Sequence, residues 1–161
     1  MATSQGLPAW APDIARGWLL NVGGLAAAGE TALRNKATTA NLGHEHHHAT
    51  TDRGMGFCTI NGLVAVTKKL IREGKAQRVM IIDLDHDEGN GTAELILGDE
   101  RIWNVSIHGS YMGGPPGTAN NHVRQVQHRA FREGVQRDVN YLGIIAATLP
   151  SLVQRHDPDL I

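Results

Sequence analysis

Three clusters of histidine, carboxylate and hydroxyl side chains carry the chemistry that this sequence offers. The first is the run at residues 44–48, which holds four of the nine histidines. The second is the acidic stretch at residues 83–90, and the third covers residues 106–108. Imidazole and carboxylate groups together suit zinc and other borderline divalent ions. These residue types therefore predict a metal-dependent site, provided that the fold brings the clusters together.

Each cluster follows a segment that we predict to be a strand. The strand predicted over residues 79–85 begins with an apolar run, residues 79–82, that is typical of a buried parallel strand. Residues 102–107 alternate weakly, and residues 37–42 are short and rich in threonine. Strands that alternate with helices indicate parallel βαβ units, whose strands all end at one edge of the sheet. The fold class is therefore α/β, a three-layer parallel sheet with helices on both faces. The three clusters are expected to meet at that edge.

Apolar periodicity predicts the helices between these strands. They are expected from residue 14 onward, from 59 or 61 to 73, over 92–97, and from 138 or 140 to 155. Gly23 and Gly24 interrupt the first helix, so either the helix bends there or another backbone packs very close. Residues 1–12 are expected to form an arm and residues 110–121 a loop. Leu160 and Ile161 look like the first step of a fourth strand.

The composition excludes several classes of protein. A length of 161 residues suits one domain, and a net charge of −1 argues against a nucleic-acid surface. The single cysteine, Cys58, excludes an internal disulfide and favours a reducing compartment, so we expect a cytoplasmic protein. We expect its side chain to be a buried small hydrophobe rather than a nucleophile. No apolar run is long enough to span a membrane and no leader is visible, so no membrane partner is expected.

Taken in order, the motifs resemble those of the histone deacetylases and the bacterial acetylpolyamine amidohydrolases. The matching segments are residues 41–43, 47–49, 52–54, 56–58, 83–85, 89–92 and 106–108. The resemblance implies an arginase/deacetylase-like domain that is partial, spans residues 1–161, and lacks the C-terminal half of the family domain. It also implies hydrolysis of the amide of acetyl-lysine or of a small acylated amine.

The resemblance also implies roles for individual residues. His47 and His48 would be the general-base and electrostatic pair beside a metal-bound water. Asp83 would orient His47, and Asn90 would orient His48. Such partners fix the tautomer of each ring.

Substrate and metal positions follow from the same resemblance. Gly56 and Phe57 would line the tunnel that holds the acylated side chain, and Asp85 and Asp87 would face the zinc ion. The resemblance further implies a structural potassium ion. Its site would be built from Asp83, Asp85, Asp87, Ser106 and Ile107.

Two departures from the family pattern put the zinc ion in question. Asp87 stands where the family has a second zinc-binding histidine, and His86 lies one position early, where an extended chain points it to the opposite face. The family's third zinc ligand and its carbonyl-polarising tyrosine would both follow Ile161. Zinc is therefore implied by the resemblance, but with an incomplete site.

Three functional hypotheses remain open from the sequence. The chain is a zinc-dependent deacetylase completed by a second chain, a catalytically dead remnant that binds metal or ligand, or an assembly module. We expect weak or absent hydrolase activity from these residues alone. We also expect a homo-oligomer, because a truncated parallel sheet exposes an unpaired strand edge and apolar surface.

The remaining histidines fit no pattern, and a surface position is the default expectation for each of them. They are His44, His108, His122, His128 and His156.

Overall fold

A computed structural model describes residues 12–118, 120–125 and 134–161 of the chain. The elements, in chain order, are α1 (Pro12–Asn35), α2 (Gly62–Arg72), β1 (Val79–Asp83), α3 (Asn90–Leu95), β2 (Ile102–His108), β3 (Asn121–Gln125) and α4 (Gly134–His156). The strands form a parallel sheet in the order β1-β2-β3. His128 and residues 1–11 of the arm predicted over residues 1–12 lie outside the described residues, and Pro12 is the first residue of α1 rather than part of an arm.

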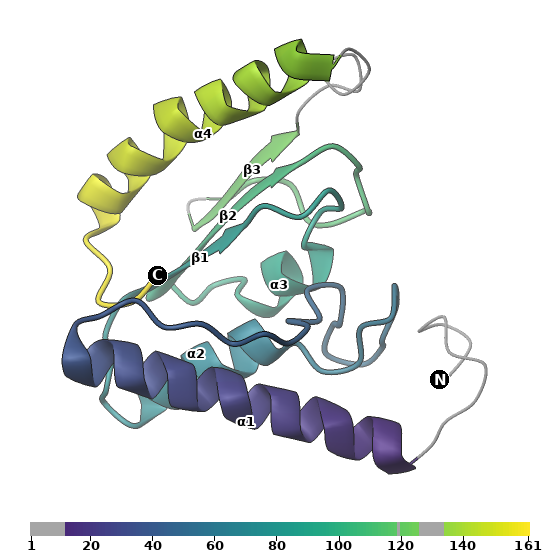
Figure 1. Ribbon diagram of the computed structural model, residues 1–161, viewed down its shortest axis with the longest axis vertical. Coiled ribbons are helices and arrows are strands. Elements are labelled where there is room, and N and C mark those ends of the chain that lie inside the picture. The colour runs from purple at the N-terminus through teal and green to yellow at the C-terminus, as the bar shows by residue number, and fades with distance from the viewer. Residues whose placement is uncertain (1–11, 119, 126–133) are drawn as a thin grey trace.

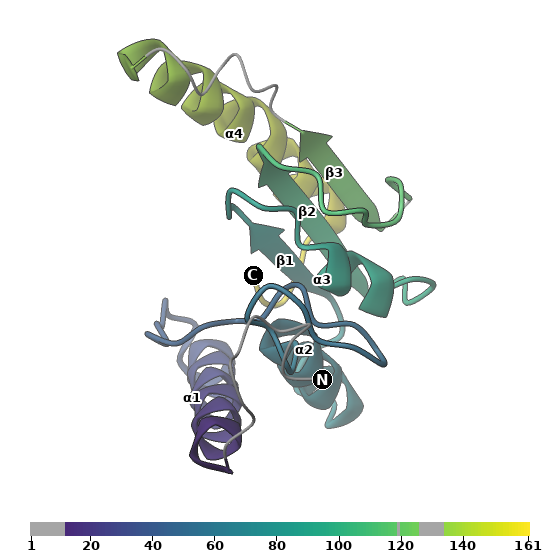
Figure 2. The same cartoon turned by 90° about the vertical axis from the view of Figure 1, so that its right-hand side faces the viewer.

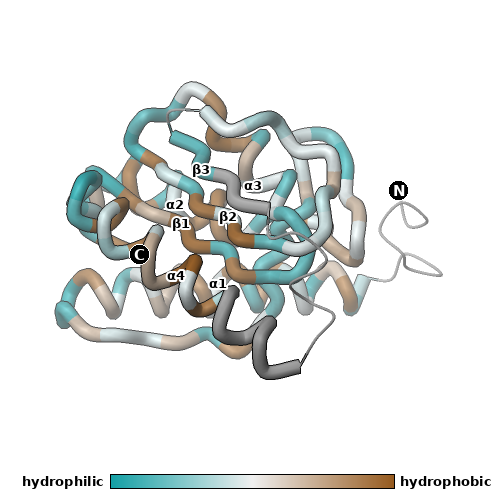
Figure 3. Tube along the Cα trace, turned by 90° about the horizontal axis from the view of Figure 1, so that it is seen from above, coloured by the Kyte–Doolittle hydropathy of each residue, from teal (hydrophilic) through white to brown (hydrophobic). Residues whose placement is uncertain are grey.

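Alternation along β1 places helices on both faces of this sheet (Figures 1 and 2). Val79 and Ile81 belong to a core cluster that includes Leu70 of α2. Met80 belongs to a second cluster on the opposite face, where Leu152 of α4 packs. The expected three-layer α/β fold is therefore confirmed. Figure 3 shows β1 and β2 as the hydrophobic centre between the layers.

The helix α2 forms where the apolar spacing predicted it. Its N-cap is Asn61, whose side-chain Oδ1 accepts a hydrogen bond from the Val64 N–H at 3.1 Å. The helix ends at Arg72, with Glu73 as its C-cap, two residues before the predicted stop at Gly74. Burial of Val64 and Leu70 against the sheet then fixes the helix in place.

The helix α1 runs without interruption through Gly23 and Gly24 (Figure 1). A Cβ at Gly24 would lie 2.7 Å from Oδ1 of Asn41, so the glycine admits a close neighbour. Neither alternative for the glycine pair holds as stated, because the helix is continuous and the close neighbour of Gly24 is not another backbone. The approaching group is a side chain, held by a 2.9 Å hydrogen bond from Asn41 Nδ2 to Asn21 Oδ1.

The predicted strand over residues 37–42 is wrong. This segment runs alongside α1 with no strand partner, and its Thr39 hydroxyl donates to the Ala28 carbonyl at 2.9 Å. A strand needs a neighbour to pair its backbone, and here α1 side chains and carbonyls supply the partners instead. Conversely, β3 was not predicted, because its sequence is polar and gives no apolar alternation.

The end of the chain reaches the free edge of β1. Leu160 forms a parallel bridge with Val79, and its carbonyl accepts the Met80 N–H at 2.9 Å. The Asp159 carboxylate accepts the N–H groups of Gln77 and Arg78 at 2.7 and 2.8 Å, which anchors this approach. The predicted first step of a fourth strand is confirmed at Leu160. Within the described part of the chain, no helix is long and apolar enough to cross a membrane.

Candidate active site

The paired histidines lie on the loop between α1 and α2, held against the start of α3. The His47 carbonyl accepts the Thr92 N–H at 3.0 Å, and the Glu45 carbonyl accepts the Gly62 N–H at 3.1 Å. These bonds fasten the loop to two helices. The rings of His47 and His48 lie side by side, with centroids 4.0 Å apart.

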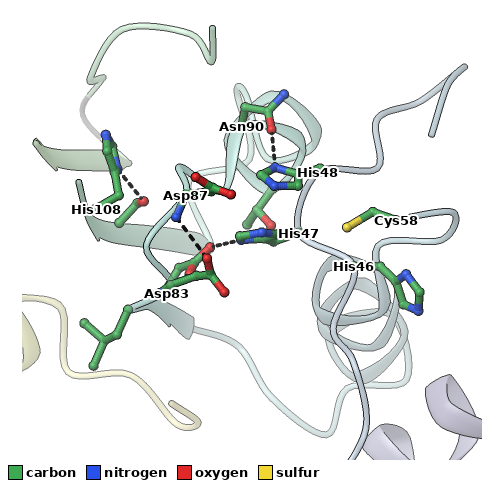
Figure 4. Close-up of polar contacts among 12 residues, drawn as sticks. His46, His47, His48, Cys58, Asp83, Asp87, Asn90 and His108 are labelled. Atoms are coloured by element: carbon green, nitrogen blue, oxygen red, sulfur yellow. Dashed lines mark hydrogen bonds and ion pairs between the residues drawn. The ribbon is translucent and has the colours of Figure 1, made fainter. Parts of the chain in front are cut away.

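His47 is hydrogen-bonded to Asp83 at the end of β1. The distance from His47 Nδ1 to Asp83 Oδ2 is 2.8 Å, and both side chains are buried (Figure 4). A carboxylate only accepts, so Nδ1 carries the proton and the other nitrogen is left for chemistry. Burial lowers the pKa of His47, but the hydrogen bond and charge of Asp83, with the charges of Asp85 and Asp87, outweigh it and leave the pKa raised.

His48 has a neutral partner instead. Its Nδ1 lies 2.7 Å from Oδ1 of Asn90, the first residue of α3 (Figure 4). Burial, together with the neighbouring His47, lowers the pKa of His48, although the Asn90 hydrogen bond opposes this. The two adjacent rings therefore have pKa values shifted in opposite directions.

Two glycines leave the space in which these pairs form. A Cβ at Gly89 would lie 2.2 Å from Asp83 Oδ2, and one at Gly56 would lie 2.5 Å from Cδ2 of His48. Gly56 also has a φ of +54°, a conformation that side chains disfavour. Larger residues at either position would displace the histidine pairs.

The carboxylates of the loop after β1 are held by successive main-chain bonds. Asp83 Oδ1 accepts the Asp85 N–H at 3.0 Å, and Asp85 Oδ1 accepts the Asp87 N–H at 2.9 Å. Asp85 is exposed and Asp87 is half-buried. Among the described residues, neither belongs to a group of three His, Cys, Asp or Glu side chains whose ligand atoms converge.

A catalytic zinc site normally has three protein ligands and one open position. Asp85 and Asp87 offer two oxygen ligands and the described residues add no third, so the donor set does not fit a complete zinc site. For the predicted structural cation, Ser106 is the ladder partner of Asp83, and Ile107 beside it is buried. The cation itself stays a prediction.

Phe57 and Gly56 lie at the outer side of the histidine pair. The Phe57 side chain is 62% exposed, and it lines a surface hollow of about 510 Å³ together with Trp18, His44 and His46. A substrate tunnel bounded by Phe57 stays a prediction.

The expected surface position of His108 is wrong, because its side chain is only 1% exposed. Its Nδ1 lies 3.0 Å from the Ser106 hydroxyl, and the two residues share one face of β2. Period-two alternation with the buried Ser106 could have indicated this position. A surface position was also expected for His122 and His156. His122 is exposed, whereas His156 is half-buried and its ring stacks on Trp103 at a centroid distance of 4.6 Å.

Glu88 is a second residue that the sequence did not single out. It is 1% exposed, and its Oε2 accepts the N–H groups of Met112 and Gly114 at 3.0 Å each. These bonds fold the loop after β2 back against the site. No sequence signal distinguishes Glu88 from the other acidic residues of this loop.

Cys58 and His44 lie as expected. Cys58 is fully buried, and burial raises the pKa of its thiol to about 11, whereas His44 is exposed. The sequence did not predict that the ligand atoms of His44, His46 and Cys58 converge within 4.8 Å of one another.

Comparison with known proteins gives a consistent result. The family model described as the histone deacetylase domain matches residues 8–161. The chain is 31% identical over 159 residues to an uncharacterized protein of Picosynechococcus, covering 97% of this chain and 49% of that protein. It is 30% identical over 151 residues to a probable deacetylase of Methanothermobacter thermautotrophicus, and the match covers 88% of this chain and 45% of that protein. The chain thus spans about half the length of these relatives.

Two solved structures share the fold. The HD domain of HDA15 matches with a TM-score of 0.68 and 21% identity, over 88% of this chain and 44% of that one. The acetylpolyamine aminohydrolase of Burkholderia pseudomallei matches with a TM-score of 0.65 and 23% identity, over 84% of this chain and 42% of that one. At these identities the likeness concerns the fold alone.

Proposed function

Because this chain belongs to the histone deacetylase family, we propose that it carries the two-histidine half of an amidohydrolase site for acetylated lysine or small acylated amines. The observation that supports this most directly is the double pairing of His47 with Asp83 and His48 with Asn90. Each partner holds Nδ1, which leaves the other nitrogen of both rings for a reacting group. The substrate class is taken from the names of the relatives, which include a probable deacetylase.

Hydrolysis of an amide requires a base that takes a proton from water and an acid that protonates the departing amine. Two titratable groups whose environments shift their pKa values apart are suited to dividing these tasks. Asp83 favours the cationic form of His47, and burial favours the neutral form of His48. We therefore assign proton acceptance to His48 and charge stabilisation to His47.

The zinc ion of the family would act on the attacking water and the amide carbonyl. Its site is incomplete in the described residues, and a third ligand from outside them would be needed to complete it. We propose that residues 1–161 are a partial domain with weak or no turnover alone. A potassium ion held by main-chain oxygens near Asp83, Asp85 and Asp87 with Ser106 belongs to the same proposal.

A second candidate is an assembly module without catalysis. An apolar groove of about 640 Å³ lies along the free edge of β1, lined by residues that include Leu25 of α1, Ile81 of β1 and Leu160. An unpaired strand edge beside apolar surface favours association with another chain. The occupant we propose is a second copy of this chain.

Complementation distinguishes the two candidates. Residues 1–161 would be assayed on an acetyl-lysine peptide and an acetylated polyamine, alone and coexpressed with the part of the Methanothermobacter relative that follows its matched segment. We expect turnover only in the complemented sample, with loss in His48→Ala and retention in the exposed control His122→Ala. Turnover that survives His48→Ala would contradict the assigned site. No turnover in a complex shown to have assembled would favour the assembly module.

A further inference from the structure

We propose that His44, His46 and Cys58 form a second metal site that binds one Zn²⁺ ion, separate from the carboxylate loop and independent of the proposed hydrolase function. Among the described residues, these three make up the group whose ligand atoms all lie within 4.8 Å of one another. In a tetrahedral zinc site, bonds of about 2.0 Å to nitrogen and 2.3 Å to sulfur place ligand atoms about 3.5 Å apart. Closing of the group from its present spacing, within 4.8 Å, would complete that geometry.

The two imidazoles are already oriented by main-chain groups. The His46 N–H lies 3.0 Å from His44 Nδ1, and the Thr59 N–H lies 3.4 Å from His46 Nδ1. A nitrogen that accepts a hydrogen bond presents a lone pair, which is the form that binds a metal. The rings are 4.5 Å apart between centroids, and the edge of Trp18 packs on His46 at 6.0 Å. An ion bound through these nitrogens would displace both amide contacts, of which the contact to His46 is the longer.

Burial favours the neutral thiol of Cys58 in the absence of an ion, but nearby main-chain groups could stabilise a metal-bound thiolate. The Cys58 sulfur donates weakly to the Gly56 carbonyl at 3.4 Å, and the main-chain amides of His48 and Ala49 face it as donors. Binding of an ion would release the thiol proton to solvent, and the negative sulfur would then receive those amide hydrogen bonds. Two imidazoles and a thiolate form a donor set that suits zinc, and they leave a fourth position for water.

The ion has a path from solvent and a structural consequence. The hollow of about 510 Å³ lined by His44 and His46 opens beside the site. Bound zinc would tie residues 44–46 to the loop that ends at Cys58. Gly56 of that loop packs against the His48 ring. Occupancy would therefore stiffen one wall around the paired histidines.

Zinc binding by the full chain tests this proposal. After treatment with a chelator and dialysis, the protein would be titrated with Zn²⁺ by calorimetry and its metal content measured by elemental analysis. We expect one equivalent to bind, and we expect Cys58→Ser and His44→Ala each to weaken binding by about tenfold or more. The double variant Asp85→Asn, Asp87→Asn is the matched control and should retain that equivalent. Circular dichroism would verify that every variant is folded.

Cobalt supplies a readout that a structural defect would not produce. Co²⁺ bound in place of zinc should give a thiolate-to-metal charge-transfer band, which Cys58→Ser should abolish. Zinc binding unchanged in Cys58→Ser and His44→Ala, or lost only in the aspartate double variant, would overturn the proposal. Failure of the folded wild-type chain to bind zinc would overturn it as well.

Discussion

At the scale of single residues, the two adjacent histidines differ in the charge that their surroundings favour. The rings are too close for both to be cationic without repulsion, with centroids 4.0 Å apart. The Asp83 carboxylate favours a proton on His47, whereas His48 faces the neutral amide of Asn90. The two rings differ because the partner of His47 is a carboxylate, whereas the partner of His48 is an amide.

Replacement of Asp83 by asparagine tests the source of the His47 shift. We expect the pKa of His47 to fall in metal-free Asp83→Asn, measured by NMR titration of the ring protons, because the hydrogen bond and charge that raise it are lost. A raised pKa contributes stability that is fully present below the unfolded value of 6.5 and is lost as pH rises through the folded value. The variant should lose that pH dependence. An unchanged pKa, or an equal fall in the exposed control Asp52→Asn, would contradict this origin.

Gly89→Ala tests the space around the Asp83 carboxylate. The added Cβ would meet Asp83 Oδ2 at 2.2 Å. We expect the free energy of unfolding to fall by about 1–3 kcal/mol, the usual cost of overpacking, as measured by urea denaturation. Gly17→Ala in α1 is the control, because nothing lies within 4 Å of its added Cβ. Equal stability of the two variants would show that the site accommodates a side chain at residue 89.

At the scale of elements, a segment became a strand only where another strand paired with it, whereas helices followed the local spacing of apolar residues. The spacing of apolar residues predicted α2 closely, because a helix satisfies its own backbone hydrogen bonds. The threonine-rich segment at residues 37–42 found no strand partner, whereas the polar β3 found one in β2. A strand requires such a partner, and a partner distant in sequence leaves no local signal.

Pairing of α1 with α2 has an electrostatic contribution centred on Glu30. Its carboxylate accepts hydrogen bonds from Lys69 at 2.7 Å and Lys75 at 2.9 Å, which lower the pKa of Glu30 to about 2. A lowered pKa gives stability that is present above the unfolded value of 4.5 and is lost as pH falls toward 2. Glu30→Gln should therefore reduce the acid dependence of unfolding in that window. The difference should shrink in 1 M salt, since the Glu30 side chain is 35% exposed. A salt-independent difference would argue against this electrostatic origin.

At the scale of the whole molecule, the proposed association rests on the groove along β1 and on the part of the β1 edge that Leu160 leaves unpaired. We expect a dimer by light scattering at micromolar concentration. Ala32→Glu, which places a charge in the groove, should shift the protein toward monomer. Ala27→Glu is the matched control, because Ala27 is exposed on the same helix and does not line the groove. A monomeric wild-type chain, or equal dissociation of both variants, would contradict this interface.

The sequence by itself determined the α/β class, the helix α2, the buried strand β1 and the ordered motifs that resemble the deacetylases. These features depend on local periodicity and on residue order, which a single chain displays directly. Only the tertiary structure decided that β3 pairs with β2, that His108 and Glu88 are buried, and that His44 and His46 approach Cys58. Those outcomes depend on contacts between residues far apart in the chain. Such contacts form only when the layers pack, so composition and spacing do not reveal them.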